Sequence, residues 1–493
     1  MLAGCRKESD SLVSYAFKEN IAFAQADSSF AAKFDILWKG LNANYAMWDF
    51  EKENGLDWDA VYEEFYPRFA ALDKEKFVSD KAFRALIEEL VSPLHDGHLA
   101  VFMKNHHTGT RVVAQPGRLR IEKDKVRGPE NEAQESFIPS LKYYQDKGEI
   151  LEYREVSSNP YLSVLKSVTE SVNETLSKVT DPDTQAALKA LQEELKSSKE
   201  YFDNEQASEA VNLYNEAVIR YEYLKIPGFE SIESALVNNP VIMKYALFKG
   251  NIAYISLKAF NLTPYLDEQS RDETFPTYTE RTKAQILEVI ATWKAWFDAI
   301  QAHHKAGDLG GVIIDMRSNE GGFATDFRYM VGALVPSGGL HYANARFKRG
   351  PGRYDYSPVM PQPMETMKAE HAVVDKPIVV LCNCTTVSMG EHTTWGVKSL
   401  PNGTVIGTRT WGGLSALNSN EDYSDSYAGT IGVENVTPVF AYVPIEVVMT
   451  QDGKILEGYG IEPDIELAFD MDKWNDGAGP DNQLDRALQH IRN

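Results

Sequence analysis

Two short stretches of this sequence carry residue types that could hydrolyse an acyl bond. In the first, LCNCTTVSMGEHTTWGVKSL at residues 381–400, an apolar strand pattern changes to a helical one at Ser388. A serine at the amino terminus of a helix lies where the helix dipole stabilises a developing anion. With Glu391 three residues later, Ser388 also fits a capping box. The pattern therefore leaves two interpretations open, a nucleophile and a helix cap.

The second stretch is IIDMRSNEGGF, residues 313–323. Gly321 and Gly322 follow an apolar strand pattern, and adjacent glycines let backbone amides approach a ligand closely. Such amides can form an oxyanion hole, which commonly contributes several kcal/mol to acyl transfer. Paired glycines also mark ordinary turns. Taken alone, this stretch does not distinguish an oxyanion hole from a turn.

Composition excludes some classes of function. The chain has 493 residues and a formal net charge of -22, and no basic cluster could neutralise phosphates, so we expect no nucleic-acid partner. No apolar run approaches the ~20 residues of a membrane helix. The sequence has neither the cysteine and histidine spacing of a metal site nor a phosphate loop, and we expect no metal and no cofactor.

The hydrophobic pattern divides the chain into four segments. We expect a tether at 1–27, a helical subdomain at 28–103 that ends in the segment of His98, a mainly helical insert at 104–245, and an α/β core at 246–493. The insert is expected to be helical because no glycine occurs between Tyr161 and Lys225, whereas a small β domain needs glycine turns.

The core segment alternates continuous apolar strands with helical patterns. Its strand candidates are GNIAYISLKAF, GGVIIDM, KPIVVLCNC and GTVIGTRT. Strands that are apolar throughout are typical of sheets buried on both faces. The predicted fold class is therefore α/β, a mostly parallel sheet flanked by helices, and we expect the N-terminal helices to pack against it. Ligands of such sheets bind beyond the carboxyl ends of the strands, where both candidate stretches lie.

The three cysteines cannot supply a disulfide framework. Cys382 and Cys384 are interpreted as buried thiols. Cys5 stands in MLAGCRKESD, and L-A-G-C resembles the lipobox of bacterial lipoproteins. The basic and apolar stretches that precede such a site are missing here. If the motif is real, Cys5 carries lipid, the membrane is reached only through this anchor, and the protein lies in the bacterial cell envelope, periplasmic or anchored to the outer membrane.

Five motifs occur in order between residues 94 and 467: LHDGH, GVIIDMRSNEGG, TTVSMGEHTTWGVKSL, VIGTRTWGG and EGYGIEPDIEL. The set resembles the serine peptidases that include tricorn protease and the C-terminal processing proteases. The resemblance covers the last 250 residues well and fails over the insert, where many relatives carry a PDZ domain. It implies a peptidase core of the ClpP/crotonase type.

The resemblance also implies roles for particular residues. Processing proteases use a serine and a lysine, but Gly413 stands where that lysine would be, so the tricorn-like branch with Ser, His and Glu fits better. Ser388 is then the nucleophile, His98 the base and Glu457 the group that orients the imidazole. The oxyanion donors would be the amide of Met389 and that of Gly321 or Gly322.

Other residues could take these roles. His95 is an alternative base, Glu446 is a weaker rival to Glu457, and His392 more often packs or meets solvent at such a place. Tricorn-like members can place a serine directly before the histidine, where this chain has Gly97. Residues interpreted as structural are Asp315 with Arg317, and His303 with His304 at a helix end.

The leading hypothesis is a serine peptidase acting on peptides or proteins. The alternative is a non-catalytic protein that binds a peptide or an apolar ligand on the same fold. A scaffold that works through the insert alone is a third interpretation. The sequence does not specify the substrate, the cleavage preference or the oligomeric state.

Overall fold

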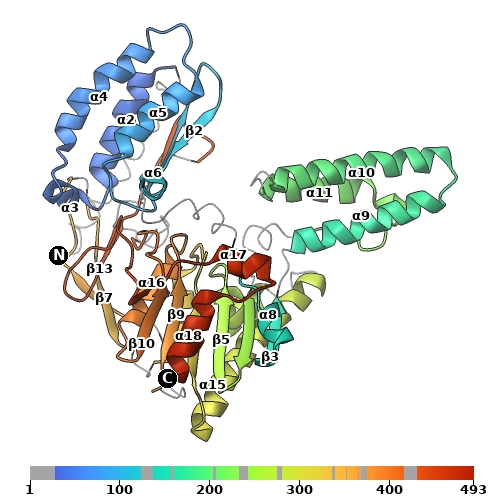
Figure 1. Cartoon of the computed structure of the whole chain (residues 1–493). Helices are drawn as coiled ribbons and strands as arrows, with labels where there is room; N and C mark the ends of the chain where they lie inside the picture. Colours follow the sequence, from blue (N-terminus) through green and yellow to red (C-terminus); the bar gives the residue numbers. More distant parts are fainter. Residues whose placement is uncertain are drawn as a thin grey trace, which may run out of the picture.

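The structure is a computed structural model, and it describes residues 28–123, 137–156, 160–203, 207–232, 243–274, 280–335, 339–350, 352–364, 366–367, 375–415, 430–432 and 434–493 (Figure 1). Cys5 lies outside the described residues. The described chain forms an α/β core, an N-terminal part with helices and its own sheet, and a bundle of three long helices. No helix within the described ranges combines the length and the apolar character needed to cross a membrane.

The core is built on a seven-stranded sheet with the order β14-β10-β9-β6-β5-β4-β3. Its strands are β3 (Ile150–Val156), β4 (Met243–Phe248), β5 (Ile252–Leu257), β6 (Gly311–Asp315), β9 (Ile378–Cys382), β10 (Gly403–Gly407) and β14 (Ile465–Glu466). The pairs from β14 to β5 are parallel, whereas β3, β4 and β5 pair antiparallel. The predicted α/β class with a mostly parallel sheet is confirmed.

Helices cover both faces of this sheet. On one face lie α15 (Glu280–Ala306) and α16 (Met389–Lys398), and on the other lie α8 (Lys142–Asp146) and α18 (Asn482–Arg492). In β6, Val312 and Ile314 point into the first layer, and Ile313 points into the second. This two-sided burial explains why the strands are apolar at every position. Cys382 and Cys384 are buried thiols outside any disulfide, as the sequence predicts.

The N-terminal helices pack on a second sheet and not on the seven-stranded one, so they meet the segment 246–467, against which they were expected to pack, through other strands of that segment. These helices are α2 (Phe30–Asn44), α3 (Trp48–Glu53), α4 (Trp58–Leu72) and α5 (Asp80–Val91). The four-stranded sheet beneath them has the order β11-β12-β1-β2, with β11 (Thr430–Ile431), β12 (Val439–Tyr442), β1 (Ala100–Lys104) and β2 (Arg111–Ala114). Two of its strands, β11 and β12, thus come from the C-terminal part of the chain. Side chains of the helices and of the sheet together form the apolar core between them.

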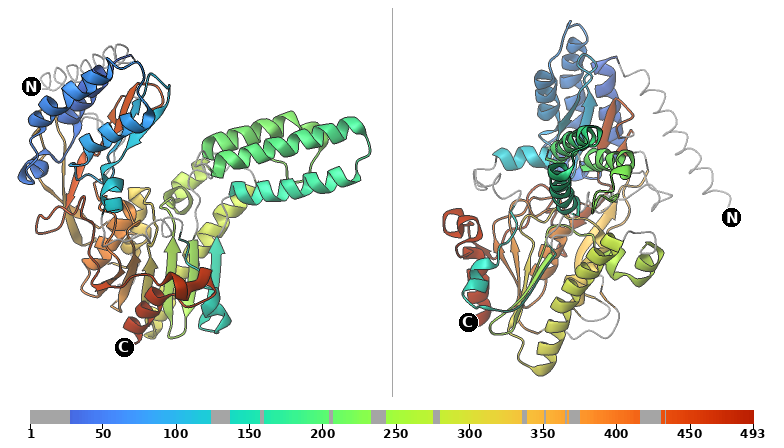
Figure 2. Two further views of the ribbon diagram at one scale, coloured as in Figure 1. Left: turned by 45° about the horizontal axis from the view of Figure 1, so that its top comes forward. Right: turned by 90° about the vertical axis from the view of Figure 1, so that its right-hand side faces the viewer.

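The expected insert holds more than helices. It contains α9 (Pro160–Lys178), α10 (Pro182–Asp203) and α11 (Ala207–Arg220), which have a separate apolar core and project away from the sheet (Figure 2). The segment 104–245 also contains β2, α6 (Pro116–Lys123), α8, β3 and the start of β4, which belong to the N-terminal part or the core. The described residues between 104 and 245 form no sheet separate from those two parts.

The remaining elements are short. The third sheet has the order β13-β7-β8, with β7 (His341–Phe347), β8 (Met360–Pro363) and β13 (Glu446–Met449). The short helices are α13 (Thr263–Leu266), α14 (Glu268–Thr274) and α17 (Met471–Trp474), with 3-10 turns at η1 (Glu222–Leu224), η3 (Ala324–Tyr329), η4 (Val331–Ala333) and η5 (Asn475–Gly477).

Candidate active site

Ser388 lies between the end of β9 and the start of α16 in a backbone conformation that L-residues rarely adopt. Its φ is 57° and its ψ is -122°. Such conformations cost on the order of 1–3 kcal/mol and persist where the surrounding structure enforces them, often at functional sites. The hydroxyl makes no cap hydrogen bond, and the amide of Glu391 donates to the Ser388 carbonyl at 2.8 Å instead. The capping-box interpretation is therefore wrong.

Glu391 stabilises the loop that follows β10. Its fully buried carboxylate accepts hydrogen bonds from the Thr410 hydroxyl at 2.5 Å, the Gly412 amide at 2.8 Å and the Gly413 amide at 2.6 Å. The carbonyl of Gly413 in turn accepts the Ser388 amide at 3.0 Å. Glu391 therefore fixes the loop against which the serine is held. From the sequence, this residue was expected only as part of a helix cap.

The glycine pair lies beside Ser388 because β6 and β9 are parallel neighbours, with Asp315 opposite Leu381. Gly321 has a φ of 84°, and a side chain built on it would begin 3.0 Å from Ser388 Oγ and 3.1 Å from the Met389 nitrogen. Its own amide donates to Asn319 Oδ1 at 2.8 Å. The amides of Met389 and Gly322 make no hydrogen bond among the described residues. These two amides are the candidate oxyanion donors. Gly321 has no side chain, which lets its backbone lie close to the side chain of Ser388.

His98 reaches this loop from the turn before β1. A side chain built on Gly413 would begin 3.4 Å from Cε1 of the imidazole, so Gly413 separates the ring of His98 from the backbone of Ser388. Nδ1 of His98 is buried without a partner, and no hydrogen bond joins the ring to Ser388 Oγ in the described structure. Burial, together with the charge of His392, lowers the pKa of His98 to about 4. The imidazole is thus neutral at physiological pH, as a general base must be.

Glu457 holds the turn that carries His98. Its buried carboxylate accepts the amides of Gly97 at 2.6 Å, Leu414 at 2.6 Å and Ser415 at 2.7 Å. It therefore connects the His98 turn to the loop after β10, across 360 residues of sequence between Gly97 and Glu457. No hydrogen bond to the imidazole is formed. Burial raises the pKa of Glu457 well above its usual range, and the charge of Asp96 raises it further.

Asp96, His98 and Glu457 each offer one potential metal-ligand atom, and these three atoms lie within 4.8 Å of one another. Five hydrogen bonds, one from each of five backbone amides, already point at the two carboxylates of Asp96 and Glu457. Positive ends of N–H dipoles disfavour a cation next to them, so we interpret the cluster as one that handles protons.

The rival histidines are occupied elsewhere. His95 Nδ1 lies 2.7 Å from the carboxylate of Glu51, which also accepts the His95 amide at 2.7 Å. His392 Nδ1 lies 3.0 Å from the Tyr342 hydroxyl, and its Nε2 lies 2.9 Å from the Leu414 carbonyl. His303 and His304 contact Asp308 and Asp375 at the exposed end of α15. None of these four rings is hydrogen-bonded to Ser388 in the part of the chain that the structure describes.

Gly97, where relatives can carry a serine, has no room for a side chain. A Cβ at this position would overlap the carbonyl oxygen of Gly412. The indole of Trp411 also donates to the Gly97 carbonyl at 3.1 Å, which closes the turn onto the loop. The described site therefore has no counterpart of a second serine beside the histidine.

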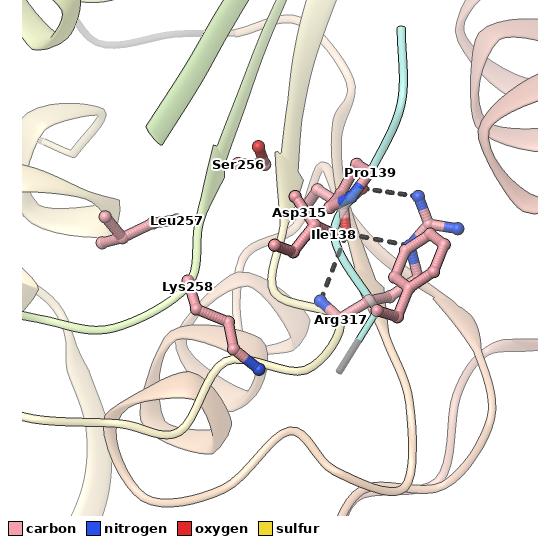
Figure 3. Close-up of a pocket in the computed structure, with 8 residues that line it drawn as sticks. Ile138, Pro139, Ser256, Leu257, Lys258, Asp315 and Arg317 are labelled. Carbon is pink, nitrogen blue, oxygen red and sulfur yellow. Dashed lines mark hydrogen bonds and ion pairs between the residues drawn. The ribbon is translucent and has the colours of Figure 1, made fainter. Parts of the chain in front are cut away.

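Asp315 and Arg317 form the ion pair that the sequence suggests (Figure 3). The guanidinium donates to both carboxylate oxygens of Asp315, at 2.9 and 2.6 Å, and to Asp481 at 3.0 Å. The central guanidinium carbon of Arg317, Cζ, also lies 4.8 Å from the centroid of the Phe137 ring. A small pocket beside the pair is lined by Ile138, Pro139, Ser256, Leu257 and Lys258. The pair ties the loop after β6 to the start of α18 and has no contact with Ser388.

Glu446, the weaker rival of Glu457, lies on β13 and accepts a hydrogen bond from the side-chain NH₂ group of Gln362. Burial raises its pKa from 4.5 to about 7. An acid whose pKa is raised on folding contributes stability below its unfolded pKa and loses it as the pH rises through the folded pKa. This contribution is therefore lost between about pH 4.5 and pH 7.

Glu446→Gln keeps an oxygen for Gln362 and removes the buried charge. We expect the variant to be more stable than the parent at pH 8, by on the order of 3 kcal/mol, and to lose that advantage near pH 4.5. Denaturant unfolding at several pH values measures the difference. Glu466→Gln, at an exposed position of β14, is the control and should change little at any pH. An advantage of Glu446→Gln that is the same at pH 4.5 and pH 8 would contradict the assignment.

Comparison with known proteins shows which family the C-terminal segment resembles. Residues 251–467 match the model of Peptidase family S41. The tricorn protease of Thermoplasma volcanium is 28% identical over 181 residues, which cover 37% of this chain and 14% of the relative. The tricorn protease of Thermoplasma acidophilum is 26% identical over 185 residues, again 37% of this chain and 14% of the relative. The chain thus matches about a seventh of the length of these relatives.

Among solved structures, mature CPAF complexed with lactacystin has a TM-score of 0.45 at 11% identity, covering 95% of this chain and 98% of that one. Residues 251–467 are therefore similar to the tricorn and C-terminal processing protease family, S41, and this similarity supports a serine-type peptidase. The match includes the turn with Gly321 and Gly322, Ser388 and Glu457, but not His98.

Proposed function

We propose that this protein is a serine peptidase that hydrolyses peptide bonds with Ser388 as nucleophile and His98 as general base. Glu457 orients His98 by holding its turn, and the amides of Met389 and Gly322 form the oxyanion hole. The observation that carries the proposal is the conformation of Ser388. A hydroxyl on a strained strand-to-helix turn, without a cap hydrogen bond and beside the unpaired amide of Met389, has the geometry of a nucleophile.

The reaction follows from these positions. His98 takes the proton of Ser388 as Oγ attacks the peptide carbonyl, and the oxyanion that forms accepts the amides of Met389 and Gly322. The imidazolium then gives its proton to the leaving amine, and water releases the acyl group by the same steps in reverse order. Because the ring and the hydroxyl are not hydrogen-bonded in this structure, the imidazole has to turn toward Ser388 when substrate binds.

The test is labelling by a fluorophosphonate, which reacts with activated serines. We expect one adduct per chain, found on the peptide that contains Ser388 by mass spectrometry. An adduct on another residue, or no adduct between pH 5 and pH 9, would count against the proposal. The second candidate, a binding protein without catalysis, is favoured by the absent hydrogen bond between Ser388 and His98, and it predicts no labelling at any pH.

We further propose that the protein is a lipoprotein of the bacterial cell envelope, anchored through Cys5. The L-A-G-C motif supports this location. The chain expressed with a bacterial lipoprotein signal should incorporate an alkyne analogue of palmitate and fractionate with membranes. Cys5→Ser should lose both properties. Lipid incorporation that persists in Cys5→Ser would show that the anchor lies elsewhere.

A further inference from the structure

Asp96 is a fully buried carboxylate two residues before His98, and only one of its oxygens is used. Oδ1 accepts the amides of His98 and Leu99, both at 2.8 Å, which makes a tight turn. Oδ2 is buried and has no hydrogen-bond partner. A buried carboxylate oxygen without a donor is costly, since such groups are almost always satisfied in folded proteins. The Asp-Gly pair in LHDGH signals a turn, but it gives no indication of the unused oxygen.

The atom that could satisfy Oδ2 is also without a partner. Nδ1 of His98 is buried and unpaired, and a ligand atom of each of Asp96, His98 and Glu457 lies within 4.8 Å of the others. Glu457 is the less suitable acceptor, because its two oxygens already accept three amides. The two orphaned atoms belong to residues two positions apart in one turn, and we expect a rotation of the ring to join them.

We propose that Asp96 is the residue that positions the imidazole, by accepting the Nδ1–H of His98 on Oδ2 when the ring turns toward Ser388. Glu457 then affects the imidazole only indirectly, by accepting the Gly97 amide and so holding the turn that carries His98. This inference rests on the proposed function, because it assigns the group that fixes the tautomer of the proposed base. A carboxylate behind the ring keeps the proton on Nδ1, leaves the other nitrogen free to take the proton of the serine, and stabilises the imidazolium that results.

Burial and the charges around Asp96 determine the pH above which its carboxylate can accept the Nδ1–H of His98. It faces Glu457, Glu51, Arg120 and the Tyr45 hydroxyl. Burial raises the pKa of Asp96 to about 7, while the amides of Leu99 and His98 and the charge of Arg120 oppose the rise. Below that pH Asp96 is protonated and cannot accept Nδ1–H. Above it the carboxylate is ionised and can. Reactivity should therefore increase with pH through about 7, although His98 has a pKa of about 4.

The test measures the second-order rate constant of fluorophosphonate labelling from pH 4.5 to pH 9. For the unaltered protein we expect an acid limb with an apparent pKa near 7. In Asp96→Asn, the amide oxygen can keep the bonds to the His98 and Leu99 amides, while the NH₂ group donates to Nδ1 and places the ring proton on the wrong nitrogen. We expect the plateau rate to fall by about 10³–10⁴-fold. The limb near pH 7 should disappear with the group that causes it.

Asp57→Asn is the matched control. Oδ1 of Asp57 accepts the amides of Asp59 and Ala60 at 3.0 and 3.2 Å, the same spacing as in the Asp96 turn, but at the exposed start of α4. The control should keep both the rate and the acid limb. Two results would overturn the inference: a labelling rate of Asp96→Asn within threefold of the parent, or a slow rate with the limb still near pH 7, which is the signature of a purely structural residue.

If Asp96→Asn does not fold, the pH dependence of labelling in the unaltered protein is the test. An acid limb near pH 4 instead of pH 7 in that protein would overturn the inference. Its failure is distinguishable from failure of the proposed function. If the parent labels on Ser388 and Asp96→Asn labels equally well, only the role of Asp96 is wrong. If the parent does not label, the nucleophile itself is wrong, and the role of Asp96 is lost with it.

Discussion

Ser388→Ala should remove peptide hydrolysis and fluorophosphonate labelling while leaving the fold intact. The hydroxyl is the proposed nucleophile, and loss of a serine nucleophile reduces kcat by about 10⁴–10⁶-fold. The fold should survive because the Ser388 hydroxyl makes no cap hydrogen bond, and its amide, which donates to Gly413 at 3.0 Å, is retained. The measurements are the labelling stoichiometry and the turnover of a fluorogenic peptide library.

Ser399→Ala, at the other end of α16, is the matched control. Its hydroxyl donates to the Trp395 carbonyl at 2.8 Å, and it lies outside the proposed site. We expect this variant to keep full labelling. Thermal unfolding of both variants distinguishes a chemical defect from a folding defect. Ser388→Ala with undiminished hydrolysis would refute the proposed nucleophile.

His98→Ala should be almost as inactive as Ser388→Ala, with a reduction in kcat of about 10⁴-fold or more. The ring of His98 lies next to Gly413, whose carbonyl holds the amide of Ser388, and burial lowers the pKa of the ring to about 4, so the neutral ring can take a proton. Because nucleophile and base act as one unit, the double variant Ser388→Ala/His98→Ala should be no worse than either single variant.

His95→Ala distinguishes the two histidines of the LHDGH motif. Its Nδ1 contacts Glu51 at 2.7 Å, so its removal should lower thermal stability and reduce kcat by less than about tenfold. The comparison is made by steady-state kinetics on the same peptide. An inactive His95→Ala together with an active His98→Ala would reverse the assignment of the base.

The sequence predicted the core sheet well because its signal is local. Continuous apolar strands such as residues 311–315 report burial on both faces, and this alone identifies an α/β sheet. The strands β11 and β12 were not predicted, because their place beside β1 depends on a sheet partner about 340 residues away, Ala100 opposite Tyr442. The antiparallel strand β3 was missed because its outer face is exposed and its pattern is polar.

The site, too, could be predicted only where its signal is local in the sequence. Ser388 could be found from the change of period at a strand end, but whether it was a cap or a nucleophile depended on its backbone dihedral angles, which the sequence does not contain. Glu391 and Glu457 accept hydrogen bonds from hydroxyl and amide groups 19 or more residues away. The role of Glu391 was therefore not visible in the sequence, and that of Glu457 came only from the resemblance. Asp96 was overlooked because an unused oxygen is visible only in three dimensions.

Gly413 has a consequence for how such a catalytic centre can change over evolutionary time. A side chain on it would begin 3.0 Å from Val387 Cγ2 and 3.4 Å from His98 Cε1, so a lysine at 413 would begin in contact with the imidazole at 98 after a small shift of Val387. The place of the lysine in one design and the place of the histidine in the other are thus next to each other at this glycine. A lineage could therefore exchange one base for the other at a single point of the fold.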